Sequence, residues 1–327
     1  MLYPLTFRPI FKERVWGGRQ LETLYQKPLP RNVLIGESWE ITDRPEGTSV
    51  IANGPLAGQD LHWLMKKHQA EFLGNAKPLD GRFPLLIKIL DAAERLSLQV
   101  HPPAALAGSL GGEPKTEMWY IARAIPGAEL FVGLKYGVTQ SDFRSKVLDG
   151  TVAECFHRVP VQSGDAMFLP SGRVHAIGGG NVIFEIQQNS DTTYRVFDWN
   201  RVGLDGSPRE LHIPESLASI DFNDFEPSLI AGSFRECGGI RKRILVEDPL
   251  FSVNLLEFSQ TERFTIHLSA VVCLGIVEGQ MLINYGSHEL CLGPGQFCLL
   301  PACLRQVEIL AQSKLCYLEA SPGDGLS

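Results

Sequence analysis

Short apolar runs, separated by glycine and proline, recur along the whole chain. Examples are FPLLIKIL from residue 83, AELFVG from residue 128, DAMFLP from residue 165 and NVIFEIQ from residue 181. The 32 glycines and 21 prolines are spread through the sequence and interrupt these runs. Such punctuation is typical of many short antiparallel strands in a sandwich or barrel. We therefore expect a mainly β protein.

Two segments have the apolar spacing of helices instead of strands. Residues 60–73 (DLHWLMKKHQAEFL) and 139–148 (TQSDFRSKVL) each begin with a polar residue and then repeat apolar positions three or four apart. We expect both to form helices that pack outside the sheets. Residues 214–225 have a mixed pattern and are predicted to form a short helix or a linker.

One motif occurs twice, with a displacement of 131 residues. The first copy, GDAMFLPSGRVH, runs from Gly164 to His175, and the second, GQFCLLPACLRQ, runs from Gly295 to Gln306. Both copies keep the glycine, the gap of five residues and the proline, and strand-like runs surround both, which indicates two related β-domains. The predicted domains are residues 1–230 and residues 231–327. Because only the first copy ends in histidine, we expect chemistry in the first half of the chain.

Four residues around the first copy have side chains that suit one metal ion. Gln99 and His101 are two apart in SLQVHP, so in a strand they share a face. Glu117 begins the strand-like run EMWYIA, and His175 follows a Pro-Ser-Gly turn. Imidazole, carboxylate and amide oxygen bind zinc and similar ions, although histidine and glutamate sets also suit Fe(II). The sequence predicts a metal site here.

These motifs resemble a known family. Residues 164–175 resemble the second conserved motif of the cupin superfamily, and LQVHP followed by KTEMWY is similar to the diverged first motif of type I mannose-6-phosphate isomerases. The stretch EIQQNSDTTYRVFDWNR, residues 185–201, resembles the most recognisable part of that family in its short bacterial form. VWGG near Trp16 and GESWEI near Glu37 also match, so the resemblance spans almost the first 230 residues.

The resemblance implies two cupin-type β-sandwich (jelly-roll) domains with a few peripheral helices, the second of them degenerate. It also implies one zinc ion per chain. The family's metal ligands fall on His101, Glu117 and His175, with Gln99 as a further ligand in some members. The cupin pattern has asparagine where this chain has Gly179, but that position is not a ligand.

Further pocket residues follow from the same resemblance. The family's proposed catalytic arginine falls on Arg195, Glu185 aligns with an acidic pocket residue, and Lys115, Glu37 and Trp16 align with others. The implied reaction interconverts mannose 6-phosphate and fructose 6-phosphate through a zinc-stabilised enediol. Either Glu185 or Glu37 suits the proton-transfer base, and we prefer Glu185.

Two features of the pocket remain open at this point. The sequence has no Gly-rich phosphate loop, so side chains must bind the phosphate, and the candidates are Arg195, Lys115, Lys135 and Arg201. The strand-like flanks of QNSDTTYRV predict a hairpin whose end approaches the metal.

The alternative functions are a cupin that binds metal or sugar without turnover, and another metal-dependent cupin enzyme such as an iron dioxygenase.

Composition limits which binding partners and which cellular compartment we expect. The 30 Lys and Arg against 37 Asp and Glu give a net charge of −7, which argues against nucleic-acid and anionic-membrane binding. The N-terminus lacks the pattern of a signal peptide, and no apolar stretch is long enough for a membrane helix. The seven cysteines form no CxxC pair and are expected to be buried thiols in a reducing cytosol. We expect a cytoplasmic monomer or weak homodimer.

Overall fold

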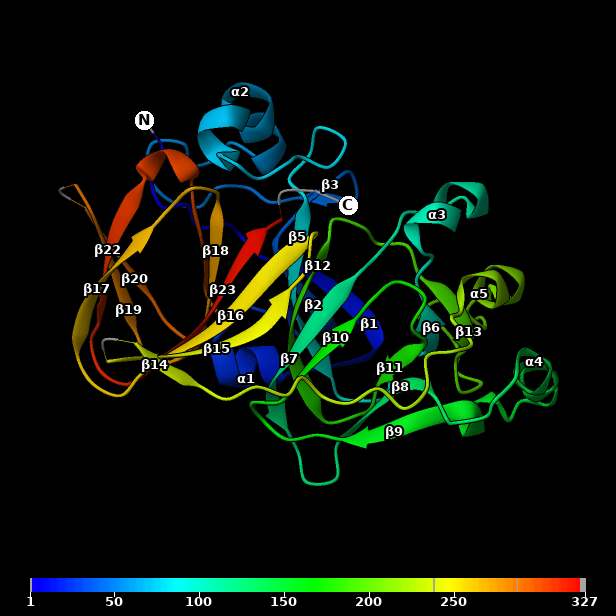
Figure 1. Cartoon of the computed structure of the whole chain (residues 1–327). Coiled ribbons are helices and arrows are strands. Elements are labelled where there is room, and N and C mark those ends of the chain that lie inside the picture. The colour runs from blue at the N-terminus through cyan, green and yellow to red at the C-terminus, as the bar shows by residue number, and fades with distance from the viewer. Residues whose placement is uncertain (1, 238, 287, 324–327) are drawn as a thin grey trace.

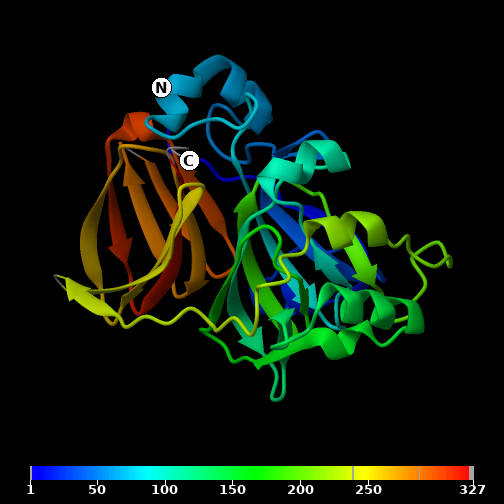
Figure 2. The ribbon, with the colours of Figure 1, turned by 45° about the vertical axis from the view of Figure 1, so that its right-hand side comes forward.

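In the computed structural model, which describes residues 2–237, 239–286 and 288–323, two β-sandwiches lie side by side (Figures 1 and 2). The six-stranded sheet of the first sandwich has the order β1 (Ile10–Gly18), β2 (Ile35–Ile41), β5 (Leu85–Ala92), β12 (Asn181–Gln188), β7 (Glu117–Ala124), β10 (Ala166–Leu169). Its five-stranded sheet has the order β13 (Tyr194–Phe197), β6 (Leu98–Val100), β11 (His175–Ile177), β8 (Glu129–Leu134), β9 (Phe156–Pro160).

The second sandwich repeats this arrangement. Its six-stranded sheet has the order β14 (Arg235–Cys237), β15 (Ile240–Glu247), β16 (Phe251–Phe258), β23 (Leu315–Pro322), β18 (Val272–Glu278), β21 (Phe297–Leu300). The four-stranded sheet has the order β17 (Glu262–His267), β22 (Gln306–Ala311), β19 (Met281–Tyr285), β20 (His288–Leu292). A small ribbon joins β3 (Asp43–Arg44) to β4 (Gly47–Thr48). The prediction of a mainly β fold with two sandwiches is confirmed.

Both long predicted helices are present and begin where their capping residues predict. α2 (Leu61–Leu73) starts after Asp60, whose carboxylate accepts a hydrogen bond from the Trp63 N–H. α4 (Gln140–Asp149) starts after Thr139, which forms a reciprocal capping box with Asp142. The mixed segment contains the short helix α5 (Ile213–Ser219). Two further helices, α1 (Gln20–Tyr25) and α3 (Ala104–Ala107), were not predicted. None of the helices in the described residues combines the length and apolar character that a membrane crossing requires.

The largest apolar core lies between the two six-stranded sheets. It contains outward-facing residues of β5 and β12, such as Ile87 and Phe184, and residues of the second sandwich, such as Phe251 and Leu318. Because β5 and β12 are also covered on their inner faces, every residue of both strands is buried. Strands covered on both faces read as continuous apolar runs, which explains the pattern FPLLIKIL.

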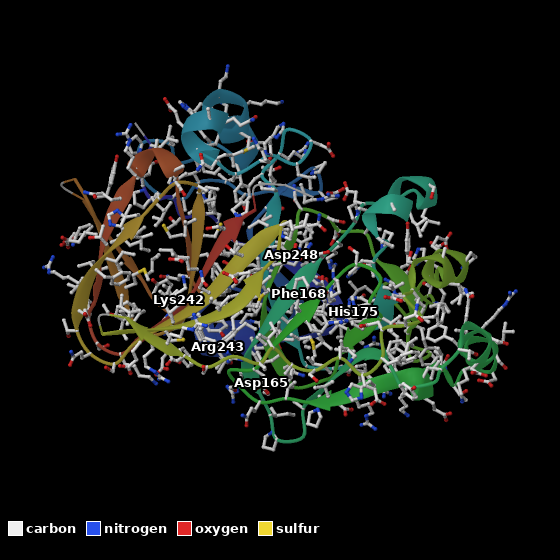
Figure 3. The ribbon with its side chains drawn as sticks, in the orientation of Figure 1. Asp165, Phe168, His175, Lys242, Arg243 and Asp248 are labelled. Carbon is white, nitrogen blue, oxygen red and sulfur yellow. The ribbon has the colours of Figure 1, made fainter. Side chains whose placement is uncertain are left out.

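Polar contacts also join the sandwiches. Arg243 on β15 donates from Nη1 to the Gly164 carbonyl at 3.2 Å and from Nη2 to the Ile230 carbonyl at 2.7 Å. Figure 3 shows Arg243 near this contact and His175 within the first sandwich. The N-terminal segment crosses to the second sandwich, where Leu5 and Leu299 exchange two backbone hydrogen bonds. The domain division at residue 230 stays a prediction.

The two motif copies occupy equivalent places. Leu169 on β10 is paired with Glu117, and Leu300 on β21 is paired with Val272. His175 on β11 is paired with Gln99, and Gln306 on β22 is paired with His267. The second sandwich therefore carries Val272 and Gln306 where the first carries two predicted metal ligands.

The cysteines divide into buried and exposed groups. Cys155, Cys273, Cys298 and Cys316 are buried free thiols, as expected. The prediction is wrong for Cys291 and Cys303, which are exposed free thiols. Cys291 lies on β20, in the four-stranded sheet, and Cys303 lies in the short 3₁₀ helix Ala302–Leu304. The side chain of Cys237 lies outside the described residues.

Gly295, the first residue of the second motif, is packed against the first sandwich. Its φ is +73°, and a Cβ there would lie 2.3 Å from Cγ of Tyr25. We expect Gly295→Ala to lower the free energy of unfolding by about 2–4 kcal/mol, from left-handed strain plus overpacking. Urea unfolding would measure this against Gly127→Ala, whose φ is +84° but whose Cβ would meet open space. Equal losses in the two variants would contradict the packing argument.

Candidate functional site

Three predicted metal ligands converge inside the first sandwich. Glu117 opens β7 in one sheet, whereas His101 follows β6 and His175 opens β11 in the facing sheet. Nε2 of His101 is 3.5 Å from Oε2 of Glu117, and Nε2 of His175 is 3.3 Å from Oε1. All three residues are buried, and their candidate ligand atoms lie within 4.8 Å of one another. The sandwich therefore brings together ligand candidates that are up to 74 residues apart in sequence.

Backbone carbonyls orient both imidazoles. Nδ1 of His101 is 2.8 Å from the Thr192 carbonyl, and Nδ1 of His175 is 2.9 Å from the Arg173 carbonyl. Each Nδ1 therefore carries the proton, and each Nε2 lone pair faces Glu117. Burial lowers the pKa of His101 to about 3, helped by the charge of Lys115, and burial also lowers the pKa of His175. Both rings are neutral at pH 7, as metal binding requires.

Glu117 is the anionic member of the set. Burial alone would raise its pKa, but the nearby ammonium of Lys115 outweighs this and holds the pKa well below its usual range. Nζ of Lys115 is 2.6 Å from Oε2 of Glu117 and 3.2 Å from Nε2 of His101. Both carboxylate oxygens are buried; Oε2 is paired with the Lys115 ammonium, whereas Oε1 has no hydrogen-bond partner among the described residues. Two neutral imidazoles and a buried carboxylate with one oxygen free of donors fit a divalent cation.

Gln99 completes the neighbourhood of the ligands. Its Nε2 lies 3.3 Å from Nε2 of His175. Rotating the amide by about 180° would place Oε1, the atom that binds metals, in the same position. Gln99 therefore lies where a fourth protein ligand is expected.

A cavity of about 550 Å³ opens beside this cluster. This volume is within the range of about 300–1,000 Å³ that small-molecule sites usually have. The cavity wall includes every predicted pocket residue: Trp16, Glu37, Gln99, Lys115, Glu185 and Arg195. Two phosphate candidates lie elsewhere. Lys135 lines a separate surface hollow with Arg158, and Arg201 is bound to Asp198 and to the Arg95 carbonyl.

The two candidate bases have different electrostatic surroundings. Burial raises the pKa of Glu185, and the negative charge of Glu117 raises it further. Burial also acts to raise the pKa of Glu37, but Lys88 and Arg14 outweigh it and lower that pKa to about 2. Trp119 donates from Nε1 to Glu185 at 2.9 Å, and its ring packs edge-on against His175, with centroids 5.3 Å apart. Glu185 is therefore held close to the candidate metal ligands.

Several charged cavity residues were missed by sequence reasoning: Arg14, Lys88, Asp191 and Arg209. Lys88 is the most buried, with Nζ 3.4 Å from Glu185 and 3.8 Å from Glu37. Although burial disfavours its ammonium, these carboxylates raise the pKa of Lys88. The sequence did carry a signal for Lys88, which is the lone cation in the apolar run FPLLIKIL. Lysine is almost never fully buried without a partner, so a buried strand with a single lysine indicates a charged partner nearby.

The predicted hairpin at QNSDTTYRV is wrong. β12 is paired with β5 and β7 in the six-stranded sheet, whereas β13 is paired with β6 in the five-stranded sheet. Residues 189–193 therefore cross from one sheet to the other. The crossing does approach the metal ligands, because the Thr192 carbonyl accepts the hydrogen bond from His101.

Comparisons with known proteins decide the family. A family model described as phosphomannose isomerase type I, catalytic domain, matches residues 5–122. The mannose-6-phosphate isomerase of Streptococcus mutans is 34% identical over 302 residues, which cover 92% of this chain and 93% of that protein. The chain belongs to the type I mannose-6-phosphate isomerase family. The family resemblance expected from the motifs is confirmed.

Members of this family from Bacillus subtilis extend the comparison. The mannose-6-phosphate isomerase ManA is 36% identical over 305 residues, which cover 91% of this chain and 93% of that protein. The crystal structure of a Bacillus subtilis mannose 6-phosphate isomerase superposes with a TM-score of 0.88 at 31% identity. That superposition covers 98% of this chain and 99% of the other. Both sandwiches therefore share the cupin fold of the family.

Proposed function

We propose that this protein interconverts mannose 6-phosphate and fructose 6-phosphate, with one zinc ion per chain held by His101, Glu117 and His175 and supported by Gln99. The observation that carries the proposal is this buried ligand set, which contacts Gln99 and Lys115 at the wall of a cavity of about 550 Å³ lined by paired carboxylates and cations. Membership of the family supplies the substrate pair. A module that only binds metal or sugar has no need of the buried Lys88–Glu185 pair beside the ligands.

Zinc is proposed from the donor set. Two imidazoles and one carboxylate, with an amide oxygen available from Gln99, match the mixed nitrogen and oxygen ligands of catalytic zinc sites. Bound zinc would act as a Lewis acid toward the oxygens of the enediol and has no redox chemistry of its own. Fe(II) is the rival ion, and the metal analysis below separates the two.

Glu185 is proposed as the proton-transfer base. Isomerisation moves a proton between two adjacent carbons, so one carboxylate must accept it and return it. A base works best when its pKa is near the working pH, and burial moves Glu185 in that direction. Glu37, with a pKa lowered to about 2, is a much weaker base. We therefore assign Glu37 to positioning Arg14 and Lys88 and to hydrogen bonding with the sugar.

Arg195 is proposed to stabilise negative charge that develops on the substrate oxygens. It lines the cavity, forms no ion pair with any described residue, and has a buried Nε without a hydrogen-bond partner. An ordered cation whose N–H group is unpaired is preorganised for an anionic partner. Lys115 lies on the same cavity, beside Glu117, and Trp16 contributes an apolar wall.

The compartment and assembly are also proposals. The cysteines described as free thiols suit a reducing cytosol, and we propose a cytoplasmic enzyme. We propose that it is a monomer or weak homodimer, which light scattering over a range of protein concentrations would test.

Metal removal tests the function directly. We expect purified protein to contain about one zinc per chain and to isomerise mannose 6-phosphate, because the catalytic site needs a Lewis acid. Chelation by EDTA should abolish turnover, and added zinc should restore it. Metal analysis by mass spectrometry and a coupled assay with a panel of aldose phosphates would measure both. Full turnover in metal-free protein would contradict the proposal, and stoichiometric iron with no isomerase activity would favour another cupin enzyme.

A further inference from the structure

The loop between β13 and α5 forms part of the cavity wall. Gly203, Leu204, Asp205 and Arg209 all line the cavity. The loop is a small ordered hairpin, because Val202 forms a β-bridge with Pro208 and the Gly203 N–H donates to the Ser207 carbonyl at 2.7 Å. Arg209 therefore reaches the cavity from a defined support. Neither the motifs nor the spacing of the sequence marked this loop as functional.

Arg209 shares one carboxylate with a second arginine. Its Nε lies 2.6 Å from Oδ2 of Asp198 and its Nη2 lies 2.5 Å from Oδ1. Nη2 of Arg201 also donates to Oδ1 of Asp198, at 2.8 Å. Asp198 is buried, so a single negative charge faces two guanidinium groups. Nη1 of Arg209 has no protein hydrogen-bond partner in the part of the chain that the structure describes.

Positive charge is in excess on this side of the cavity. Burial lowers the pKa of Arg195, and the neighbouring charge of Arg209 lowers it further. Nη1 of Arg195 donates to the Glu210 carbonyl, so the same loop holds both guanidiniums. On the other side of the cavity, the carboxylates are paired with cations. Glu37 contacts Arg14 and Lys88, and Asp191 contacts Lys88. The carboxylate of Asp205, at the loop tip, accepts a hydrogen bond from the Ser207 N–H.

We propose that Arg209 is a specificity-determining residue that binds the phosphate of the substrate through Nη1, while Asp198 holds the opposite edge of its guanidinium. A phosphate dianion offers three strong acceptor oxygens and would balance the excess charge of Arg195 and Arg209. The proposal rests on the proposed function, because it takes the substrate to be a sugar phosphate. It replaces Lys135 and Arg201, which do not line the cavity, as phosphate ligands.

The competing explanation is that Arg209 only ties the loop to Asp198. Arg201 provides a matched control, because it binds the same carboxylate but does not line the cavity. Removing either arginine leaves Asp198 with one guanidinium partner. Only the removal of Arg209 takes a cation from the cavity wall.

The experiment uses the zinc-loaded full chain and the variants Arg209→Ala, Arg209→Lys and Arg201→Ala. Calorimetry would measure the Kd of mannitol 1-phosphate, a polyol phosphate that cannot isomerise because it has no carbonyl, and kinetics would measure kcat and KM. We expect Arg209→Ala to raise both Kd and KM by about 10- to 100-fold, with a smaller change in kcat. Arg209→Lys should recover part of the loss, because it keeps the charge without the planar fork.

A Kd unchanged in Arg209→Ala would overturn the proposal, and so would equal losses in Arg209→Ala and Arg201→Ala. Uncharged mannitol should bind the wild-type protein and Arg209→Ala equally, and a loss of mannitol binding that matches the loss for mannitol 1-phosphate would also count against a phosphate contact. The binding measurement needs no turnover. An inactive wild-type protein that still binds mannitol 1-phosphate through Arg209 would therefore contradict the proposed function and leave the phosphate site standing.

Discussion

His175→Gln is expected to remove bound zinc and to lower the isomerase kcat by about 10³-fold or more. The Nε2 lone pair of His175 faces Glu117, and its Nδ1 is fixed by the Arg173 carbonyl. A glutamine amide oxygen is a weaker ligand than imidazole and lacks this second hydrogen bond. Loss of a Lewis acid removes several kcal/mol of transition-state stabilisation, which corresponds to the stated factor. Metal analysis and a coupled assay would measure the two effects.

His175→Gln reproduces in the first sandwich the residue that the second sandwich has at the equivalent position. Gln306 occupies the place of His175 in the second sandwich, which has Val272 in the place of Glu117. His157→Gln, on β9 at the edge of the five-stranded sheet, is the matched control and should keep zinc and activity. If His175→Gln retained a full complement of zinc, His175 would not be a ligand.

Most of the fold was predictable because its signals are local. Apolar runs between glycines and prolines gave the strands, and the polar residues Asp60 and Thr139 marked where two helices begin. The repeated motif predicted the second sandwich, since strand pairing around Leu169 and Leu300 is equivalent. The candidate metal ligands could be picked out because each lies in a patterned neighbourhood of the sequence.

The cavity was only partly predictable because it is built between two sheets. The wrong hairpin has the same cause, since strand-like flanks do not reveal that β12 and β13 belong to different sheets. Arg14 and Arg209 reach the cavity from a strand and a loop whose local sequences carry no signal for it. Arg201 lies close in sequence to Arg195, but its guanidinium is held by Asp198 and the Arg95 carbonyl, and Lys135 lines a separate hollow.

The position of the site follows from how the sandwiches pack. The six-stranded sheets bury their outer faces against each other. Polar side chains of β5, β7 and β12 that take part in a site must therefore lie on the inner face of their sheet. In the first sandwich that face carries Lys88, Glu117 and Glu185. In the second sandwich the interior is filled by apolar residues such as Phe258 and Val272. The second sandwich thus covers and supports the sheet that holds the site.

Arg195→Ala is expected to lower kcat by about 10²–10³-fold while the zinc content stays near one per chain. The magnitude is that of losing one preorganised group that stabilises developing negative charge. Zinc should remain because Arg195 contacts none of the proposed ligand atoms; its Nη1 donates to the Glu210 carbonyl instead. Arg195→Lys should recover part of the rate, because it keeps the charge but loses the Nε–H group. Steady-state kinetics and metal analysis on the same preparations would measure both quantities.

Arg158→Ala is the control for this prediction. Arg158 is an exposed arginine of β9 that forms an ion pair with Glu129, away from the cavity, and its loss should leave kcat unchanged.

The contrast with Arg209 is equally informative, because Arg195→Ala should act mainly on kcat whereas Arg209→Ala should act mainly on KM. An unaffected kcat in Arg195→Ala would remove Arg195 from the catalytic residues. A loss of zinc together with kcat would instead give Arg195 a structural role in holding the metal site together.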